Sequence, residues 1–554
     1  MKKIYGFAAL SAAMLLASCS NNDEPNVVTP GEGDSIAKSY LAINLSAPSD
    51  DTRAITAGET DPSEYAVANV QFAVFDEAKK LVMITDEYED FTWGNSTDID
   101  VDKQSSKKIL EIKQADAASV GYVMAILNTP GLSTMGFTVG SSTIDDVRKK
   151  IGDYNTITGK DNKTYYVMSN SAYEDTETIG TVKTDYTAYA TSFRGHVYPT
   201  MGQAIDDAVN IYVERVAARC DLTNNDKSKG NTVTIPDADA VVNGSAAKIE
   251  VKITGVDFIY DPNKSYLVKS IDEIPTDISN KTWYTEGSHR THWADAPKLA
   301  WNKDATKSDY TQATYSAAEI NGAVGETTMN FYLHENVTEN PTYVVITGDI
   351  YVNDQKNVAI YQLWQDGKYY TEEGAKKELC GYLKANGYQY YYENDDVKST
   401  KDITIDDVTF KPSTTTDFEA YISINLTAED ENKNTLKLCK GTTAQTSESG
   451  VLTMATDQYK ALVYGGGKTY YYCPIAPKLN GENEDGVEGV IRNHIYNIEF
   501  GTIMGLGVPL YDPKGELLPK DPKTNEDKSP KWYFNATINI LKWKVYKQTM
   551  NFGN

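Results

Sequence analysis

Short apolar stretches that alternate with polar residues recur along the chain, and turn-forming residues separate them. Such alternation is typical of β-strands that bury one face, and clusters of Gly, Asn, Asp and Pro supply the turns between them. The clearest predicted strands are 69–75, 121–127, 165–168, 210–216, 343–352 and 537–545. Strands bounded by turns predict an all-β fold made of β-sandwiches.

Helical patterns are confined to two places. Ser142 and Asp145 resemble a capping box ahead of an apolar turn, which Gly152 would end. The range 371–383 predicts the second helix, although Gly374 inside it lowers helix propensity. The sandwiches are therefore expected to carry only a few short helices.

Near the N-terminus, four apolar residues alternate with Ala42, Asn44 and Ser46, so one face of a predicted strand is apolar. The apolar positions are Leu41, Ile43, Leu45 and Ala47. The polar, turn-forming stretch 49–52 follows and leads to Arg53 and Ala54. Proteases prefer exposed stretches of this kind, so the bond from Arg53 to Ala54 is a predicted cleavage site. An ordinary surface arginine is the alternative.

The last residues of the chain also alternate, but on two faces. Leu541, Trp543 and Val545 share one face of an extended strand. The other face carries Tyr546, Met550 and Phe552. A bulge or twist between the two triplets would give each its own direction. The tail 541–554 is either an edge strand of its own domain or a strand offered to a neighbour.

The N-terminal residues have the order of a secretion signal: Lys2 and Lys3, a short apolar run, and small residues before Cys19. The run is too short to span a bilayer core, which needs about 20 apolar residues. The sequence 16–19 resembles a bacterial lipobox, and 20–30 is a polar tether. We therefore expect a signal peptide at 1–18 and a segment 19–53 anchored to the outer membrane by lipid (palmitate) on Cys19.

The chain has 554 residues, enough for at least two domains with separate cores. Its character changes near Cys220, where the strand-like 211–216 gives way to the polar 224–230. The predicted domains are 54–220 and 221–554. Cys220, Cys380, Cys439 and Cys473 lack metal-knuckle spacing and are either buried thiols or disulfide partners, the former favoured.

Composition argues against several functions. A net charge of -25 opposes nucleic-acid binding, which requires positive charge. His289 and His292 form the one close histidine pair, and no matching ligand follows nearby. The stretch 465–469 lacks the earlier glycine of a phosphate loop and is expected to be a hairpin turn. No nucleophile elbow is present, so we predict no catalytic residues, no metal, no cofactor and no enzyme.

Several motifs, in this order, carry a resemblance to a known family. In the C-terminal part they are 472–475, Gly489-Val490-Ile491-Arg492-Asn493-His494-Ile495-Tyr496, 505–509 and 538–543. Upstream support comes from 72–76, 125–128, 167–171 and 213–218. Together they resemble the Mfa1-like fimbrillin family, type V pilus subunits of Bacteroidales. The middle, 221–366, matches only loosely.

The resemblance implies two transthyretin-like β-sandwiches, export as a lipoprotein, cleavage after Arg53 and polymerisation by donor-strand exchange in a surface fimbria. The expected partners are other copies of the chain and accessory pilins. In this scheme the strand with Leu41 is displaced, and the tail 541–554 is the donor, which favours a stalk subunit over a tip adhesin. An anchor subunit is the other alternative, and it would be expected to keep its lipidated end instead of losing it at Arg53. The surface receptor is left open.

Two alternatives stay open from the sequence. One is a monomeric, surface-anchored lipoprotein that binds glycans or proteins through aromatic residues such as Trp283, Trp293, Trp301 and the tyrosines around Tyr390. Aromatic faces stack on sugars, but they more often fill β-cores. The other is an exported hydrolase, for which the sequence offers no specific motif.

Overall fold

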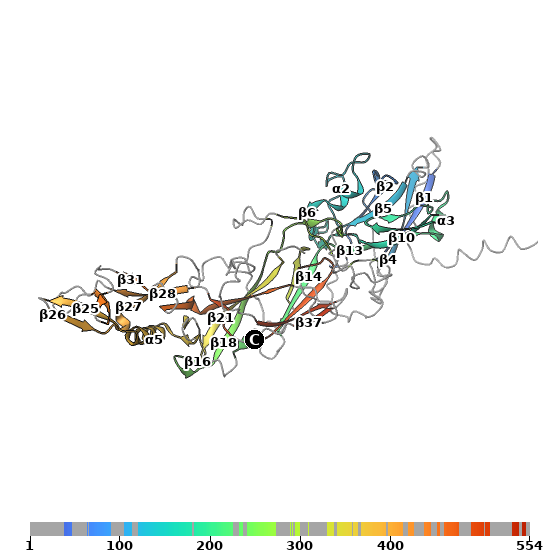
Figure 1. The fold of residues 1–554 in the computed structure, drawn as a ribbon. Coiled ribbons are helices and arrows are strands. Elements are labelled where there is room, and N and C mark those ends of the chain that lie inside the picture. The colour runs from blue at the N-terminus through green and yellow to red at the C-terminus, as the bar shows by residue number, and fades with distance from the viewer. Residues whose placement is uncertain are drawn as a thin grey trace, which may run out of the picture.

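The structure is a computed structural model, and the part of the chain that it describes is mostly β-sheet. The described residues are 38–46, 64, 66–89, 105–113, 120–179, 182–224, 232–235, 241–272, 289, 291, 294–299, 309, 329–336, 341–356, 358–363, 367–394, 397–413, 419–425, 437–441, 443–444, 451–454, 459–475, 489–503, 505–509, 534–541 and 546–549. Figure 1 shows an elongated molecule in which N-terminal strands lie at one end and residues near 400 at the other.

The N-terminal region is built on one eight-stranded sheet. Its order is β3-β2-β5-β9-β13-β1-β4, and β12 pairs with β5. The strands are β1 (Lys38–Ser46), β2 (Val70–Asp76), β3 (Leu81–Ile84), β4 (Ser105–Lys113), β5 (Val120–Leu127), β9 (Met168–Asn170), β12 (Thr191–Ser192) and β13 (Val209–Arg215). Apolar residues of β1 and β4 share one buried cluster with residues of β2 and β5, so the sheet folds over its own core.

The opposite face of β2 and β5 packs on a second apolar cluster. Ala73 and Phe75 of β2 belong to it, and so do Ile144 and Val147 of helix α2 (Ile144–Arg148). Leu267 and Val268 join the cluster from a segment that returns after the first C-terminal strands. This return is tied down by β19 (Ser265–Tyr266), which pairs with β6 (Ile151–Gly152).

The central region contains two sheets around a shared core. One sheet is β20-β14-β34-β36-β37, with β14 (Ala218–Asn224), β20 (Met329–Leu333), β34 (Ile495–Ile503), β36 (Phe534–Leu541) and β37 (Tyr546–Thr549). The other is β15-β18-β21-β33-β35, with β15 (Thr232–Thr234), β18 (Ile249–Ile259), β21 (Tyr343–Val352), β33 (Lys468–Pro474) and β35 (Val508–Pro509); β22 (Gln355–Lys356) pairs with β21.

A third region lies farthest from the N-terminal sheet and has its own core. Its first sheet contains β16 (Val241–Val242), β17 (Ser245–Ala246), β23 (Ile360–Leu363), β24 (Tyr369–Tyr370), β27 (Val408–Pro412), β28 (Glu419–Asn425), β31 (Val451–Thr453) and β32 (Lys460–Tyr464). Its second contains β25 (Tyr388–Asn394), β26 (Val397–Lys401), β29 (Lys437–Lys440) and β30 (Thr443–Ala444). Helix α5 (Glu372–Ala385) packs on this core.

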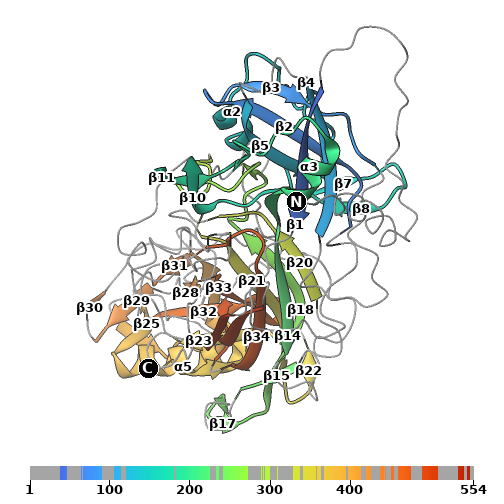
Figure 2. The same cartoon turned by 90° about the vertical axis from the view of Figure 1, so that its right-hand side faces the viewer.

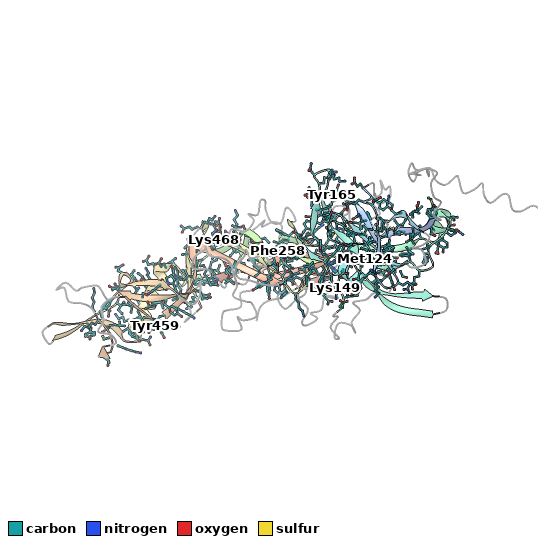
Figure 3. All side chains as sticks on the ribbon, turned by 90° about the horizontal axis from the view of Figure 1, so that it is seen from above. Met124, Lys149, Tyr165, Phe258, Tyr459 and Lys468 are labelled. Carbon is teal, nitrogen blue, oxygen red and sulfur yellow. The ribbon has the colours of Figure 1, made fainter. Side chains whose placement is uncertain are left out.

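The third region is an insertion between two paired strands. β21 and β33 are antiparallel neighbours, yet most of the third region lies between them in the sequence. The chain enters it through β23 and leaves through β32, and these two strands pair with each other. Met124, Phe258 and Tyr459, one from each region's core, lie in succession along the molecule in Figure 3.

Three local predictions require correction. The capping box is formed by Thr143 and Asp146, one residue later than predicted, because the Ser142 hydroxyl accepts a hydrogen bond from the Thr138 amide. The predicted strand 165–168 is divided between β8 (Thr164–Tyr166), which pairs with β7 (Thr156–Thr158), and β9. The glycines 465–467 are not a hairpin turn, because they link β32 and β33, which belong to different sheets.

Candidate functional site: the seat of strand β1

Strand β1 lies inside the N-terminal sheet and has hydrogen-bonded neighbours along both edges. All nine of its residues pair with β4, from Lys38 opposite Lys113 to Ser46 opposite Ser105. Its other edge pairs in parallel with β13, from Ile43 opposite Val209. Both edges of the strand are therefore occupied.

The inner face of β1 is part of the core. Leu41, Ile43 and Leu45 have no exposed surface and pack in the apolar cluster of the folded sheet. Complete burial of one such side chain contributes roughly 1.5–3 kcal/mol. Because a whole domain is stable by only about 5–15 kcal/mol, the sandwich cannot lose these three side chains without a replacement.

The outer face of β1 is covered by one short segment. Helix α3 (Met201–Asp206) contacts β1 and β4, and its one buried residue is Ala204. Ala42 is also completely buried on the outer face of β1. Just before the helix, Tyr198 forms a β-bridge at the edge of β1: the Tyr40 amide donates to the Tyr198 carbonyl at 2.7 Å, and the Tyr198 amide donates to the Tyr40 carbonyl at 2.9 Å.

One side-chain hydrogen bond also fixes the register on this outer face. Asn44 Nδ2 donates to Asn210 Oδ1 of β13 at 2.8 Å, and the two residues are direct partners in the parallel ladder. We call the set formed by β4, β13, Tyr198 and α3 the β1 seat. The seat holds β1 along both edges and on its outer face.

The C-terminal tail occupies a different kind of position. Leu541 ends β36 and pairs with Ile495 of β34, inside the central region. Tyr546 begins β37, which pairs with β36 through four residues and lies at the edge of its sheet. The structure thus places the start of the predicted donor as an edge hairpin of its own central sheet.

Several predicted site residues lie outside the described residues. They are Cys19, Ala47, Arg53, Ala54, Trp543, Val545, Met550 and Phe552. The predictions of lipidation, cleavage and strand donation therefore remain predictions. Leu41, Ile43 and Leu45 do come together in one core, as their alternation indicated.

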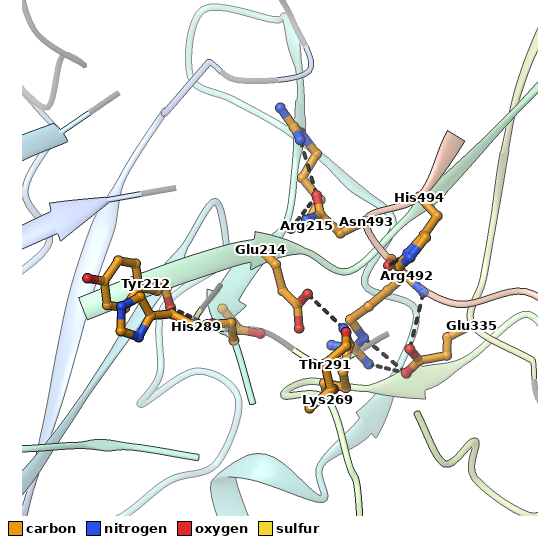
Figure 4. A network of polar contacts seen from close by, with 12 residues as sticks. Tyr212, Glu214, Arg215, Lys269, His289, Thr291, Glu335, Arg492, Asn493 and His494 are labelled. Atoms are coloured by element: carbon orange, nitrogen blue, oxygen red, sulfur yellow. Dashed lines mark hydrogen bonds and ion pairs between the residues drawn. The ribbon is translucent and has the colours of Figure 1, made fainter. Parts of the chain in front are cut away.

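Charged residues that the sequence did not single out are buried where the N-terminal and central regions meet (Figure 4). Lys269 Nζ donates to Glu214 Oε2 at 2.8 Å and to the Thr291 carbonyl at 3.0 Å. Burial raises the pKa of Glu214 and lowers that of Lys269, and the mutual attraction opposes both shifts. Glu214 belongs to β13, so the strand that pairs with β1 also anchors this junction.

A second buried ion pair at the junction uses a residue of the C-terminal motif. Arg492 Nη2 lies 2.9 Å from Glu335 Oε2, and both side chains have no exposed surface. Arg492 also donates to the carbonyls of Leu267 and Tyr266 at 3.1 and 2.7 Å. Within the motif 489–496, Arg492 therefore contributes its charge to the junction. In the sequence, the place of this motif in the ordered series was the signal that pointed to Arg492.

Glu64 provides a third buried contact at the same junction. Its carboxylate accepts from Arg219 Nη1 at 2.8 Å and from the Tyr332 hydroxyl at 2.6 Å, and its carbonyl accepts from Arg215. Asp221 holds the other side of the Arg219 guanidinium at 2.5 Å. Glu64 stands in no motif or periodic pattern, so the sequence offered no signal for it.

His334 bridges two carboxylates that come from different regions. Its Nε2 lies 3.3 Å from Asp153 Oδ1, and its Nδ1 lies 3.6 Å from Asp261 Oδ2. Burial lowers the pKa of His334, but the two carboxylates outweigh burial and raise it to about 9. The side chain is therefore an imidazolium near neutral pH.

The described residues offer little that resembles a catalytic or metal centre. They contain no group of three or more potential metal ligands from His, Cys, Asp and Glu. His289 stacks on Tyr212 at 3.9 Å between ring centroids, while His292 lies outside the described residues. Cys220, Cys380 and Cys439 are buried thiols. Among these same residues, no helix is long and apolar enough to cross a bilayer.

Of the four aromatic residues named for glycan binding, the structure describes Tyr390. Tyr390 is completely buried in the core of the third region, in agreement with the alternative that such aromatic residues fill a β-core. Trp283, Trp293 and Trp301 lie outside the described residues. The aromatic argument for a sugar site therefore has no support from Tyr390.

Comparison with known proteins gives one family match. Residues 462–549 match the family described as major fimbrial subunit protein type IV, fimbrillin, C-terminal. This confirms the resemblance over the C-terminal motifs, and the matched family is structural, in agreement with the prediction of a non-enzyme. No curated protein matches the chain significantly.

Solved structures of surface proteins also resemble the chain, at low identity. A candidate cell adhesion protein from Parabacteroides distasonis is 12% identical, covering 93% of this chain and 99% of that chain, with a TM-score of 0.40. The tip fimbrial protein Mfa3 from Porphyromonas gingivalis is 12% identical over 57% of this chain and 80% of that chain, with a TM-score of 0.28. The fimbrial anchor protein Mfa2 from the same organism is 9% identical over 69% of this chain and 97% of that chain, with a TM-score of 0.22. Scores this low do not assign a role within the fimbria.

Proposed function

We propose that this chain, whose residues 462–549 match the fimbrillin C-terminal family, is a stalk subunit of a type V fimbria that supports adhesion. In this proposal the precursor is exported, lipidated at Cys19 and anchored to the outer membrane. Cleavage after Arg53 then frees β1, and a strand of another copy takes its place. The N-terminal and central regions would be the two transthyretin-like sandwiches that the family resemblance implies.

The position of β1 is the observation that carries this proposal. β1 supplies three completely buried side chains to the core and ends shortly before Arg53. Removal of such a strand exposes an apolar groove and two unpaired strand edges, which recruit any available strand. A strand from another molecule can fill the groove and pair with both edges. Its main-chain hydrogen bonds give affinity, and its alternate side chains give register.

The positions of Ser46 and Glu64 support release of β1 without disruption of the rest. Ser46 pairs with Tyr212 of β13, and the Glu64 carbonyl accepts from the Arg215 side chain of the same strand. These two residues of β13 are separated by roughly 10 Å along the strand. Arg53 lies between the two anchors in sequence, so a cut there separates β1 from an N-terminal end that Glu64 still holds.

The test begins with purified precursor and an arginine-specific protease. N-terminal sequencing should find a new end at Ala54, and gels should then show a ladder of multimers that uncut precursor does not form. Sequencing of surface-exposed protein from cells provides the second measurement. A mature chain that still begins at an acylated Cys19 and stays monomeric would contradict the stalk assignment and favour an anchor subunit or a monomeric lipoprotein.

A further inference from the structure

The tail 541–554 has two apolar faces, and either could point into the core if the tail replaced β1. The residues that cover the outer face of β1 favour one of them. Ala42 and Ala204 are both completely buried where α3 covers β1. A strand that replaces β1 under an unmoved α3 therefore needs a small side chain at the position of Ala42. Two residues further, Asn44 donates to Asn210 of β13 at 2.8 Å, so an amide fits there.

The first face of the tail does not meet these requirements. If Leu541, Trp543 and Val545 pointed into the core, Lys542 and Lys544 would lie on the outer face. A lysine would then have to fit where the seat holds Ala42. Leu541 is also already paired with Ile495 in its own central sheet.

The second face does meet them. With Met550 and Phe552 in the core, the residue between them is Asn551, and the previous outer residue is Thr549. This triplet repeats the order of Ile43-Asn44-Leu45 in β1: large apolar, asparagine, large apolar. Alignment of Asn551 with Asn44 places the small Thr549 at the position of Ala42. The same register puts Met550 and Phe552 at the buried positions of Ile43 and Leu45 and the polar Gln548 at that of Leu41, so it replaces two of the three apolar core side chains.

The same triplet pattern also occurs at 538–540, but that segment is in the middle of β36. It is hydrogen-bonded on one side to β34 and on the other to β37. Among the described residues the edge strand β37 pairs with β36 alone, so Tyr546–Thr549 can leave at low cost.

We propose that Asn210 and helix α3 select the incoming strand, and that this strand is 546–552 of a second copy, with Asn551 in place of Asn44. The inference rests on the proposed strand exchange and names its register and its specificity residues. Ala204 and Asn210 are positioning residues, because they act on the outer face while the core binds the apolar side chains.

The test uses full-length chain cut after Arg53, with ladder formation followed on gels over a concentration series. Asn551→Leu and Asn210→Leu should each weaken assembly roughly three- to tenfold, the range expected for one lost hydrogen bond. Their combination should cost little more than either alone, because both remove the same bond. Lys544→Leu, which precedes the proposed strand in the same tail, is the control and should assemble like the wild type.

The choice of face is tested with polar substitutions. Met550→Ser and Phe552→Ser should abolish the ladder, while Trp543→Ser should leave it, and an unchanged melting temperature of each uncut variant shows that it folds. The opposite pattern, or full assembly of Asn551→Leu, overturns the inference.

A synthetic peptide of residues 546–554 separates this inference from the proposed function. Fluorescence anisotropy measures its binding to the cut chain. If the wild type forms no ladder but the cut chain binds this peptide three- to tenfold more tightly than the Asn551→Leu peptide, strand selection stands and the filament fails. If ladders form but the two peptides bind equally, the filament stands and strand selection fails.

Discussion

Strands β1 and β37 lie near opposite ends of the chain and are held in opposite ways. β1 has nine residues, neighbours on both edges and cover on both faces. Figure 2 shows β1 inside the upper, N-terminal region. β37 has four residues and, among the described residues, pairs with β36 alone. Local opening is easy for an edge element with few contacts and rare for a buried one. The strand proposed to leave is therefore the one least able to leave unaided.

This difference explains why a covalent cut would be needed at one end only. While β1 is linked to the rest of the chain, it competes for its seat as an intramolecular segment at high effective concentration. A donor from another molecule cannot match that concentration. After a cut, β1 becomes a separate segment, and a second copy can compete on equal terms. In the proposed scheme, connectivity as well as burial would prevent premature assembly.

The largest expected effect comes from removal of the cleavage site. Arg53→Lys should block an arginine-specific protease, keep β1 in its seat and abolish the ladder completely. A lysine-specific protease is the matched control, because it should cut the variant at the same position and restore multimers. Normal ladders from Arg53→Lys with the arginine-specific protease would show that the cut lies elsewhere.

The next effect tests whether the inner face of β1 stabilises the precursor. Ile43→Ala should lower the free energy of unfolding by about 2–5 kcal/mol, because it removes a completely buried side chain and leaves a cavity. Denaturant unfolding of uncut precursor measures the loss. Asn44→Ala, on the outer face, should cost only about 0.5–1.5 kcal/mol through its hydrogen bond. Equal losses at both positions would contradict the assignment of inner and outer faces.

The same comparison can be carried into the assembled state. If β1 departs, Ile43→Ala should have no effect on the thermal stability of cut, multimeric protein. A persistent loss in the multimer would mean that β1 stays in place.

The sequence predicted what alternation and turns encode. The ranges 69–75, 121–127 and 343–352 correspond to β2, β5 and β21 within one residue at each end. Alternation also identified the inner face of β1, because a period of two is sufficient to separate core from surface. The family motifs placed Arg492 in an ordered pattern without indicating its ion pair with Glu335.

The sequence could not predict which strands become neighbours. The parallel pairing of β1 with β13 joins residues far apart in the chain, and local patterns carry no information about such partners. For the same reason the third region went unrecognised, since its strands look like any others. The sequence did not indicate Glu64 and His334, because a single charged residue is expected on the surface unless its partners are known.

A smaller effect tests how the region that holds β1 is joined to the region that holds β37. His334 has a folded pKa of about 9, above its ordinary value of 6.5, because of Asp153 and Asp261. The contribution of charged His334 to the free energy of unfolding is therefore complete below pH 6.5 and is lost as pH rises through 9. The loss is at most about 3 kcal/mol by proton linkage. Unfolding at pH 6.5 and 9.5 measures it.

His334→Gln is the control for this pH dependence. Other groups titrate over the same range in both proteins, so the difference between wild type and variant isolates His334. The variant should be less stable at pH 6.5 and should lose less stability on going to pH 9.5. Equal pH dependence in the two proteins would show that the contacts with Asp153 and Asp261 do not stabilise the junction.

The last comparison of stability concerns the other strand, β37. Deletion of 546–554 removes β37, whose four cross-strand positions contribute roughly 0.2–1 kcal/mol each. The uncut monomer should therefore lose about 1–4 kcal/mol, no more than the single substitution Ile43→Ala, while the cut protein should form no ladder. Calorimetry of the uncut monomer and gels of the cut protein give the two readings. A tail that stabilised the monomer as strongly as β1 does would be an integral part of the central sheet, and the asymmetry between the two strands would disappear.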